Sequence, residues 1–432
     1  MTAGSTRPRV SRKRRAMFCC LIAVGLVLLT EVASLIGLFC VERDFSFKKL
    51  HRQQDRLAER RPDRAIGDEV LHPYLGWVLN YDNSPNVEVA GDTYPVNEHG
   101  FLDRSELFHR RANDKCIVAI VGGSVAWYLS IHGTDALIRE LKTSPRFADK
   151  EIVIVELALS SYKQPQQLFV LSYLLALGAE FDIVVNVDGF NEVALHTAEN
   201  ATKDVFYAYP RNWYARVREI PHADIAHKVY RLQSRRRTRR DWAEAFSRMS
   251  IRHSPTMNLL WRSRDRSLLR VITEDRIAIQ SHMASGKRSY LQTGPPQPYA
   301  TDKEMFEQLA QLWKRCSLQL HRMCISNDIQ YFHVLQPNQY VRDSKPMSDA
   351  ERKLAVNPDQ KYREGVVNAY HLLVQAGDEL VKQDVHFLDM TMLFAETPTP
   401  IYIDDCCHYN QQGNEMLATA IARKIVQAQG RD

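Results

Sequence analysis

Two polar segments near opposite ends of the chain carry residue types that suit nucleophilic catalysis. Ser124 follows two glycines at the end of the apolar run 116–121, and His408 ends an Asp-Cys-Cys-His sequence shortly before a C-terminal helical pattern. A serine hydroxyl is a poor nucleophile at neutral pH unless an adjacent base takes its proton. His408 can be that base, and Asp405, three residues earlier, can orient its imidazole. Asp404 is a competing orienter that the sequence does not exclude.

A third polar segment offers a hydrogen-bond donor for such a reaction. Asn191 lies just after the apolar run 183–187, within the sequence Asp-Gly-Phe-Asn-Glu. A side-chain amide that donates to a developing oxyanion contributes about 2.7–4 kcal/mol to the transition state. The alternative is an ordinary turn asparagine. Glu192 beside it is more typical of a helix start or an orienting carboxylate than of a catalytic acid.

These residues need a scaffold that brings them together, and the apolar pattern predicts one. Strands are expected at 116–122, 152–157, 182–188, 329–335 and 385–389. Helices are expected at 134–143, 164–178, 303–326, 361–383 and 411–428. Strands that alternate with helices predict a flavodoxin-like, three-layer α/β/α fold with a parallel sheet of about five strands. In such a fold, polar groups that follow buried strands gather at the carboxyl edge of the sheet.

The N-terminus predicts one transmembrane helix ahead of this fold. Residues 1–15 are basic and contain no acid, and residues 16–41 are apolar with Glu31 as the only charge. A span needs about 20 apolar residues, so an uncleaved signal anchor is expected, with a cleaved signal peptide as the alternative. The basic tail should stay cytoplasmic and the remainder should be exported. Glu31 indicates either a helix–helix contact or a single tolerated charge.

The rest of the chain divides into a connecting region and a catalytic region. Residues 42–110 read as a charged stalk followed by a turn-rich lead-in, and residues 111–430 as the α/β domain. A basic helical insertion at about 200–300 interrupts the alternation and contains five arginines within 235–240. It is read either as a solvated helical segment or as a surface for anionic lipid headgroups or an anionic glycan.

Composition excludes several other classes. The formal net charge of +6 arises from 57 Lys and Arg against 51 Asp and Glu, which is mild for 432 residues and gives no case for nucleic-acid binding. Eight cysteines do not make a disulfide framework in a chain this long. Metal ligation by Cys406 and Cys407 is disfavoured because no second Cys/His pair has zinc-site spacing. We therefore expect no metal and no cofactor.

The polar segments, taken in order, resemble the sequence blocks of the SGNH (GDSL-like) hydrolase family over roughly residues 115–425. The resembling blocks are Ile120–Ser124, Leu157–Tyr162, Gly189–Glu192 and Asp405–His408. The lead-in Asn97–Phe101 also resembles the segment ahead of the first block in membrane-anchored members. Two departures stand out, since Gly123 replaces the usual aspartate before the serine and Ser161 replaces a family glycine.

This resemblance implies a role for each residue. Ser124 would be the nucleophile, His408 the base and Asp405 its orienter. The oxyanion hole would comprise the backbone N–H groups of Ser124 and Ser161 and the side chain of Asn191. The implied protein is a membrane-anchored serine hydrolase that cleaves an ester on a lipid or an acylated carbohydrate, or transfers the acyl group to a sugar hydroxyl. The alternative is a non-catalytic glycan- or lipid-binding module on the same fold.

Overall fold

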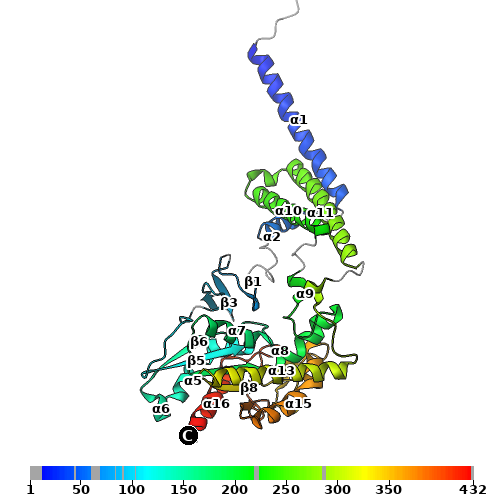
Figure 1. Cartoon of the computed structure of the whole chain (residues 1–432). Coiled ribbons are helices and arrows are strands. Elements are labelled where there is room, and N and C mark those ends of the chain that lie inside the picture. Colours follow the sequence, from blue (N-terminus) through cyan, green and yellow to red (C-terminus); the bar gives the residue numbers. More distant parts are fainter. Residues whose placement is uncertain are drawn as a thin grey trace, which may run out of the picture. The chain divides into compact units, whose positions relative to one another are not determined.

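The computed structural model describes residues 12–42, 45–59, 69–82, 84–89, 92–102, 104–217, 223–284 and 289–429. The contacts among them define two units, which Figure 1 shows with the elements labelled. The smaller unit contains the described residues of 12–59 and 223–284, and the larger contains those of 69–217 and 289–429. Most of the predicted basic tail at 1–15 lies outside the described residues.

Five apolar runs form the central parallel sheet of the larger unit. In spatial order the strands are β6 (Glu151–Glu156), β5 (Lys115–Gly122), β7 (Ile183–Asp188), β8 (Gln330–Leu335) and β9 (His386–Asp389). Each predicted strand matches an observed one to within one residue at either end. The predicted flavodoxin-like architecture, with five parallel strands flanked by helices, is therefore confirmed.

The central strands are buried because both faces of the sheet are covered, as is usual for parallel sheets. Every residue of β7 is buried, and Ile117, Val118 and Val184 have no exposed surface. The chain leaves β5 for β6 on one side and then crosses back to β7 on the other side. The sheet order therefore reverses at β5, and the carboxyl end of that strand is the position where α/β sheets bind ligands.

Helices connect the strands and form the outer layers. They are α4 (Ser124–His132), α5 (Thr134–Leu141), α6 (Pro145–Ala148), α7 (Gln166–Ala176), α8 (Phe190–Leu195), α13 (Asp302–Ile325), α14 (Asp349–Ala355), α15 (Lys361–Val381) and α16 (Gln411–Gln429). Helix α16 packs on α4 and α5, whereas α13 packs on α7, α8 and α15. Right-handed crossovers assign these two groups to opposite faces of the sheet.

Short elements complete the larger unit. Two antiparallel hairpins lie in the turn-rich lead-in: β1 (Glu69–His72) pairs with β2 (Gly76–Leu79), and β3 (Asn86–Val89) pairs with β4 (Asp92–Pro95). The other short segments are helical: η1 (His196–Asn200), η2 (Ala201–Lys203), α9 (Trp213–Arg216) and α12 (Tyr290–Thr293). The lead-in thus belongs to the α/β unit.

The smaller unit is helical and joins the N-terminal region to the insertion. It contains α1 (Arg12–Val41), α2 (Phe47–Glu59), α10 (Ala223–Ser247), η3 (Ser250–His253) and α11 (Pro255–Ala284). Its buried apolar residues come from both parts of the sequence: Leu38, Phe45, Leu50, Ala243, Phe246 and Trp261. The insertion was expected within the domain at 111–430 and the stalk beside the lead-in, whereas the contacts group the insertion with the stalk helix α2 and with α1.

Helix α1 is apolar over most of its length but carries one contact that explains its acidic residue. Within the described chain, the segment Lys13–Val41 is the helix long and apolar enough to cross a membrane, and its most apolar stretch of 18 residues has a mean hydropathy of 2.4. One carboxylate oxygen of Glu31 accepts a hydrogen bond from Ser254 Oγ at 2.6 Å, and the other accepts one from the backbone N–H of Thr256 at 3.1 Å. Glu31 therefore caps the N-terminus of α11, which is the helix–helix contact that its position indicated.

The basic stretch at 235–240 is partly neutralised within the unit. Arg239 Nε lies 2.6 Å from Asp265 Oδ1, and Arg235 pairs with Asp275; both acids belong to α11. Asp265 and Asp275 are buried. These arginines consequently hold α10 against α11, while Arg237 keeps 78% of its side chain exposed.

Candidate active site

Three of the predicted site residues follow neighbouring strands of the sheet. Ser124 is the first residue of α4, directly after β5. Ser161 lies in the loop after β6, and Asn191 lies in the first turn of α8, after β7. Because β5 is hydrogen-bonded to both β6 and β7, the loops at their carboxyl ends meet. The sheet order thus accounts for the convergence of residues that are far apart in the sequence.

His408 reaches Ser124 from the loop between β9 and α16. Its Nε2 lies 2.8 Å from Ser124 Oγ. The imidazole also packs against the ring of Tyr128, one turn along α4, with 4.9 Å between ring centroids. Ser124 is 8% exposed and the His408 side chain 18% exposed, so the pair is shielded but remains accessible. The predicted nucleophile and base are therefore brought into hydrogen-bond contact.

The carboxylate that contacts His408 belongs to Asp404, not to the predicted Asp405. Asp404 Oδ2 lies 2.5 Å from His408 Nδ1. Asp405 points elsewhere and accepts a hydrogen bond from Asn357 Nδ2 at 2.9 Å. The choice of Asp405 is thus corrected to Asp404, the competing residue of the sequence analysis.

Local turn geometry explains this one-residue difference. The backbone N–H of Ile403 donates to the carbonyl of His408 at 3.1 Å, which closes the loop around the two acids. Asp404 Oδ1 then accepts the backbone N–H groups of Cys406 at 2.9 Å and Cys407 at 3.0 Å, as aspartate side chains do when they cap a turn. These bonds turn the Asp404 carboxylate toward the imidazole.

The electrostatics of Asp404 suit an orienting role. Burial alone would raise the pKa of the Asp404 carboxyl. The hydrogen bond and charge of His408, together with the backbone N–H groups, lower this pKa by more than burial raises it, so the net pKa is below the ordinary value. An ionised carboxylate only accepts, so His408 Nδ1 carries the proton in this pair. A neutral imidazole then presents Nε2 as the acceptor for the hydroxyl of Ser124, which is the tautomer that a general base requires.

The candidate oxyanion hole lies on the other side of Ser124. Asn191 Nδ2 donates to the carbonyl of Tyr162 at 2.7 Å, which fixes the amide beside the loop that contains Ser161. A Cβ on Gly123 would lie 2.1 Å from Asn191 Nδ2 and 2.9 Å from Tyr162 O. Gly123, Asn191 and the Ser161–Tyr162 loop are thus packed against one another. This contact explains the glycine before the serine, since an aspartate Cβ would displace the amide.

Ser161 has an unusual backbone for a residue with a side chain. Its φ is 72°, a left-handed value that favours glycine. A glycine, which is the usual residue here in the family that the sequence resembles, would adopt this conformation without strain. Its hydroxyl accepts a hydrogen bond from Arg211 Nη1 at 2.5 Å. Arg211 was not identified from the sequence, because it lies within the irregular segment after η2 and shares no motif spacing with Ser161.

A buried polar network supports the segment that carries Asn191. Asp188 at the end of β7 accepts hydrogen bonds from Trp313 Nε1 at 2.6 Å and His333 Nε2 at 2.8 Å. The second ring nitrogen of His333 bonds Ser317 Oγ at 2.7 Å, so both nitrogens of this buried strand residue have hydrogen-bond partners. Glu192 accepts the backbone N–H of Gly189 at 2.8 Å, which makes it a helix-start carboxylate. Burial raises the pKa of Glu192 to about 8.

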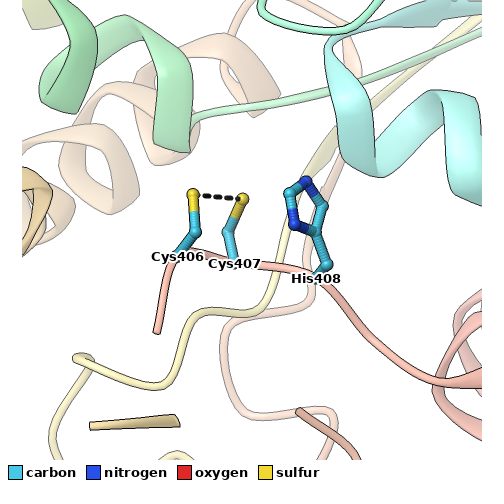
Figure 2. A group of neighbouring side chains, drawn as sticks. All are labelled: Cys406, Cys407 and His408. Carbon is cyan, nitrogen blue, oxygen red and sulfur yellow. Dashed lines mark hydrogen bonds between the residues drawn. The ribbon is translucent and has the colours of Figure 1, made fainter. Parts of the chain in front are cut away.

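The two cysteines beside His408 form a cluster with it (Figure 2). Ligand atoms of Cys406, Cys407 and His408 all lie within 4.8 Å of one another, and the two Sγ atoms are 3.5 Å apart. Both ring nitrogens of His408 are, however, already hydrogen-bonded to Asp404 and Ser124. Burial raises the pKa of the Cys407 thiol well above its ordinary value, which disfavours the thiolate that a metal needs. The arrangement therefore suits a base better than a metal ligand.

Comparisons with known proteins add little beyond this geometry. No protein-family model matches the chain, and no curated protein matches it. Among solved structures, the chain is similar to the crystal structure of the lipase/acylhydrolase from Enterococcus faecalis, at 10% sequence identity and a TM-score of 0.32. That similarity covers 73% of this chain and 96% of the other. Such a TM-score carries no argument about activity, so the functional conclusion depends on the site itself.

Proposed function

We propose that this chain is a membrane-anchored serine hydrolase of the SGNH type that cleaves an ester-linked acyl group, or transfers it, on a lipid or an acylated carbohydrate. The observation that carries the proposal is the alignment of three side chains: Ser124 Oγ lies 2.8 Å from His408 Nε2, and His408 Nδ1 lies 2.5 Å from Asp404. A hydroxyl, an imidazole and a carboxylate in this order are recognised as a catalytic triad by geometry and not by sequence position.

The first half of the reaction forms an acyl-enzyme. Ser124 Oγ attacks the carbonyl carbon of the ester, and His408 Nε2 takes the hydroxyl proton. The negative charge on the former carbonyl oxygen is stabilised by the N–H groups of Ser124 and Ser161 and by the Asn191 amide. When the tetrahedral intermediate collapses, the imidazolium gives its proton to the departing alkoxide. Asp404 stabilises the imidazolium throughout this half-reaction.

The second half releases the acyl group. A water molecule, or a sugar hydroxyl in the transfer variant, gives its proton to His408 Nε2 and attacks the acyl carbon. Collapse of the second intermediate expels Ser124 Oγ, which recovers the proton from His408. The same groups serve both outcomes, so the relative access of water and acceptor decides between hydrolysis and transfer.

The proposed location is on the exported face of a membrane. The apolar helix α1 is long enough to span a bilayer. Residues 1–15, which lead into the helix and form its first turn, contain no acid and six basic residues: Arg7, Arg9, Arg12, Lys13, Arg14 and Arg15. Basic residues next to a span favour the cytoplasmic side. The α/β unit that follows would then be exported, where it meets lipid or glycan esters.

Turnover of 4-nitrophenyl acetate by the full chain in a neutral detergent tests this proposal. We expect burst release of 4-nitrophenol followed by slower turnover, because an acyl-enzyme accumulates. Ser124→Ala should abolish both phases, while the exposed Ser172→Ala on α7 should retain them. A wild-type protein that binds lipids or glycans but releases no 4-nitrophenol would instead identify a non-catalytic binding module on this fold.

A further inference from the structure

Arg211 approaches the candidate oxyanion hole from a side that the proposed mechanism does not use. The Ser161 backbone N–H is a proposed oxyanion donor, and its side-chain oxygen accepts from Arg211 Nη1 at 2.5 Å. Ser161 holds this position at a φ of 72°, which is unfavourable for a residue with a Cβ. A strained residue beside a reactive group points to a function for its side chain. Here that side chain holds a guanidinium next to the reaction centre.

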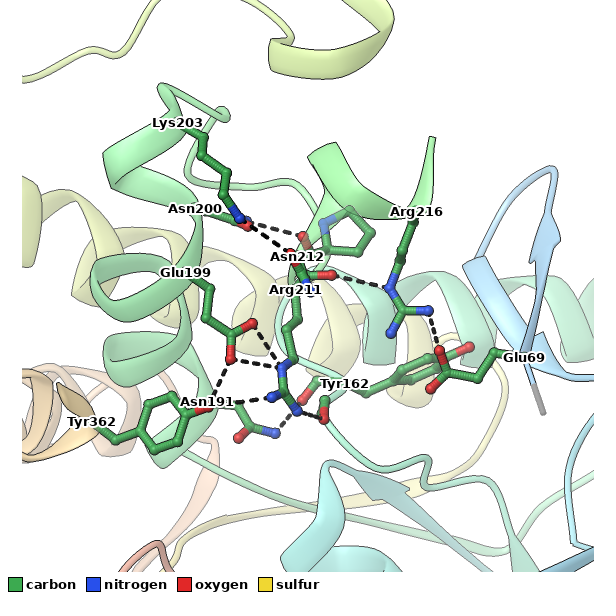
Figure 3. Close-up of polar contacts among 12 residues, drawn as sticks. Glu69, Tyr162, Asn191, Glu199, Asn200, Lys203, Arg211, Asn212, Arg216 and Tyr362 are labelled. Atoms are coloured by element: carbon green, nitrogen blue, oxygen red, sulfur yellow. Dashed lines mark hydrogen bonds and ion pairs between the residues drawn. The ribbon is translucent and has the colours of Figure 1, made fainter. Parts of the chain in front are cut away.

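Two further side chains fix the orientation of the guanidinium (Figure 3). Both carboxylate oxygens of Glu199 accept from Arg211 Nε, at 2.9 and 2.8 Å. Tyr362 accepts from Arg211 Nη2 at 3.3 Å and donates to Glu199 Oε1 at 2.7 Å. Glu199 lies in η1, Tyr362 in α15 and Ser161 in the loop after β6, so three separate segments of the fold hold the Arg211 guanidinium. The Arg211 side chain nevertheless stays 34% exposed.

This arrangement leaves part of the guanidinium available to a ligand. A guanidinium has five N–H groups in a fixed plane. In the described part of the chain, Nε and one N–H on each terminal nitrogen have partners. One N–H on Nη1 and one on Nη2 remain, and such a pair matches two oxygens of one anionic group. Glu199 already neutralises the charge of Arg211, so the free N–H groups offer hydrogen bonds with little net positive charge, which suits a monoanion better than a dianion.

We propose that Arg211 forms a subsite for a monoanionic group of the substrate, a carboxylate or a phosphodiester, adjacent to the ester that Ser124 attacks. This subsite rests on the proposed function and narrows its substrate to an anionic glycan or an anionic lipid. Ser161 is the link, because the same residue presents its N–H to the oxyanion and its hydroxyl to Arg211. Because the guanidinium is already held in place, less conformational entropy is lost when an anion binds to it.

Matched pairs of charged and neutral esters test the subsite with the full chain in neutral detergent. A charge on the acyl side is tested by 4-nitrophenyl hemisuccinate against 4-nitrophenyl butyrate. A charge on the leaving group is tested by 4-acetoxybenzoate against its methyl ester. A phosphodiester is tested by 4-acetoxyphenyl methyl phosphate against 4-acetoxyanisole. The readout is the charged-to-neutral ratio of kcat/KM, in which any general loss of activity cancels.

The wild type should favour the charged member of at least one pair. Arg211→Met should lower that ratio by roughly tenfold to a hundredfold, as expected for loss of a charge-assisted hydrogen bond. Arg211→Lys should lower it less. Arg423→Met is the matched control, since Arg423 in α16 forms a comparable ion pair with Glu140 in α5, at 3.0 Å. Its ratio should equal that of the wild type.

Further variants remove the remaining ambiguities. Arg211→Met leaves the negative charge of Glu199 without its ion-pair partner, and this charge could repel an anionic ester. The double variant Arg211→Met/Glu199→Gln removes the charge, and its charged-to-neutral ratio should stay low. If both Arg211 variants fail to fold, Tyr362→Phe, which loosens the guanidinium, should still lower the ratio severalfold. The subsite is wrong if neutral esters are cleaved and no ratio differs between wild type and these variants. If the wild type cleaves no ester at all, the proposed function fails instead.

Discussion

Asp404 and His408 are joined by a 2.5 Å contact between Oδ2 and Nδ1, while the other Asp404 oxygen is held by backbone N–H groups of the same loop. Asp405, the next residue, bonds Asn357. Asp404→Asn should therefore lower kcat for 4-nitrophenyl acetate by about 10⁴-fold, because an amide favours the wrong imidazole tautomer.

The matched control is Asp405→Asn, which changes the adjacent carboxylate in the same way. Its kcat should stay within a few fold of the wild type. If kcat fell equally in both variants, or more in Asp405→Asn, the result would indicate that Asp405 orients the imidazole of His408.

Gly123 gives a second test, directed at the oxyanion hole. Its φ is −90°, which alanine accepts, but a Cβ there would lie 2.1 Å from Asn191 Nδ2. Gly123→Ala should displace the amide and lower kcat by about 10²–10³-fold, the effect of losing one oxyanion donor. Gly178→Ala is the control, since its φ of 95° strains the backbone while no atom lies within 4 Å. That variant should lose stability but keep kcat; full activity in Gly123→Ala would argue against Asn191 as a donor.

The buried carboxyl of Glu156 should make the free energy of unfolding depend on pH. Burial raises the pKa of its carboxyl to about 7, against the opposing charge of Arg104. An unfolded glutamate has a pKa near ~4.3, so between about pH 4.5 and 7 the folded state binds a proton that the unfolded state has released. The free energy of unfolding attributable to this group therefore falls as pH rises through that window.

Urea unfolding at pH 5 and pH 8 measures this slope. Glu156→Gln should lose less stability than the wild type over that interval, because an amide does not titrate. Glu151→Gln, at the exposed end of the same strand, should retain the wild-type slope. Identical slopes in all three proteins would show that Glu156 does not change protonation on folding.

The contact of Glu31 with Ser254 and Thr256 should stabilise the first turn of α11. Glu31→Leu removes the acceptors for Ser254 Oγ and for the N–H of Thr256. Backbone amides at 254–258 should then exchange hydrogen faster, which mass spectrometry of peptides from the full chain in detergent detects. Val32→Ala, on the exposed side of α1, should leave that exchange unchanged. Equal protection in Glu31→Leu would mean that α11 does not depend on α1 for its first turn.

The sheet and the contact between Ser124 and His408 were predictable from the sequence, for a physical reason. Strands such as β5 and β7 are buried on both faces, so their sequences are almost entirely apolar, with Asn186 as the polar exception inside β7, and polar residues follow them. Ser124 and Asn191 could therefore be assigned to the same edge of the sheet. The choice between Asp404 and Asp405 could not be made in this way, because it depends on how one tight loop turns its side chains.

Contacts between distant segments of irregular sequence were also beyond prediction. Arg211 and Ser161 are separated by 50 residues, and Ser254 and Glu31 by 223. Neither pair belongs to a periodic pattern, so nothing in composition or spacing joins its members. The basic run at 235–240 left two readings open, a solvated helical segment or a surface for an anionic partner, and neither of them anticipated that Arg239 pairs with buried Asp265 inside the unit.

The central claim is that Ser124 is an activated nucleophile, and covalent labelling tests it most directly. The full chain in neutral detergent would be treated with a fluorophosphonate, and the adduct mapped by peptide mass spectrometry. We expect one modified residue, Ser124, with labelling lost in Ser124→Ala and strongly slowed in His408→Ala, because the serine needs its base. An adduct on another serine, or labelling at Ser124 that proceeds equally fast without His408, would contradict the account.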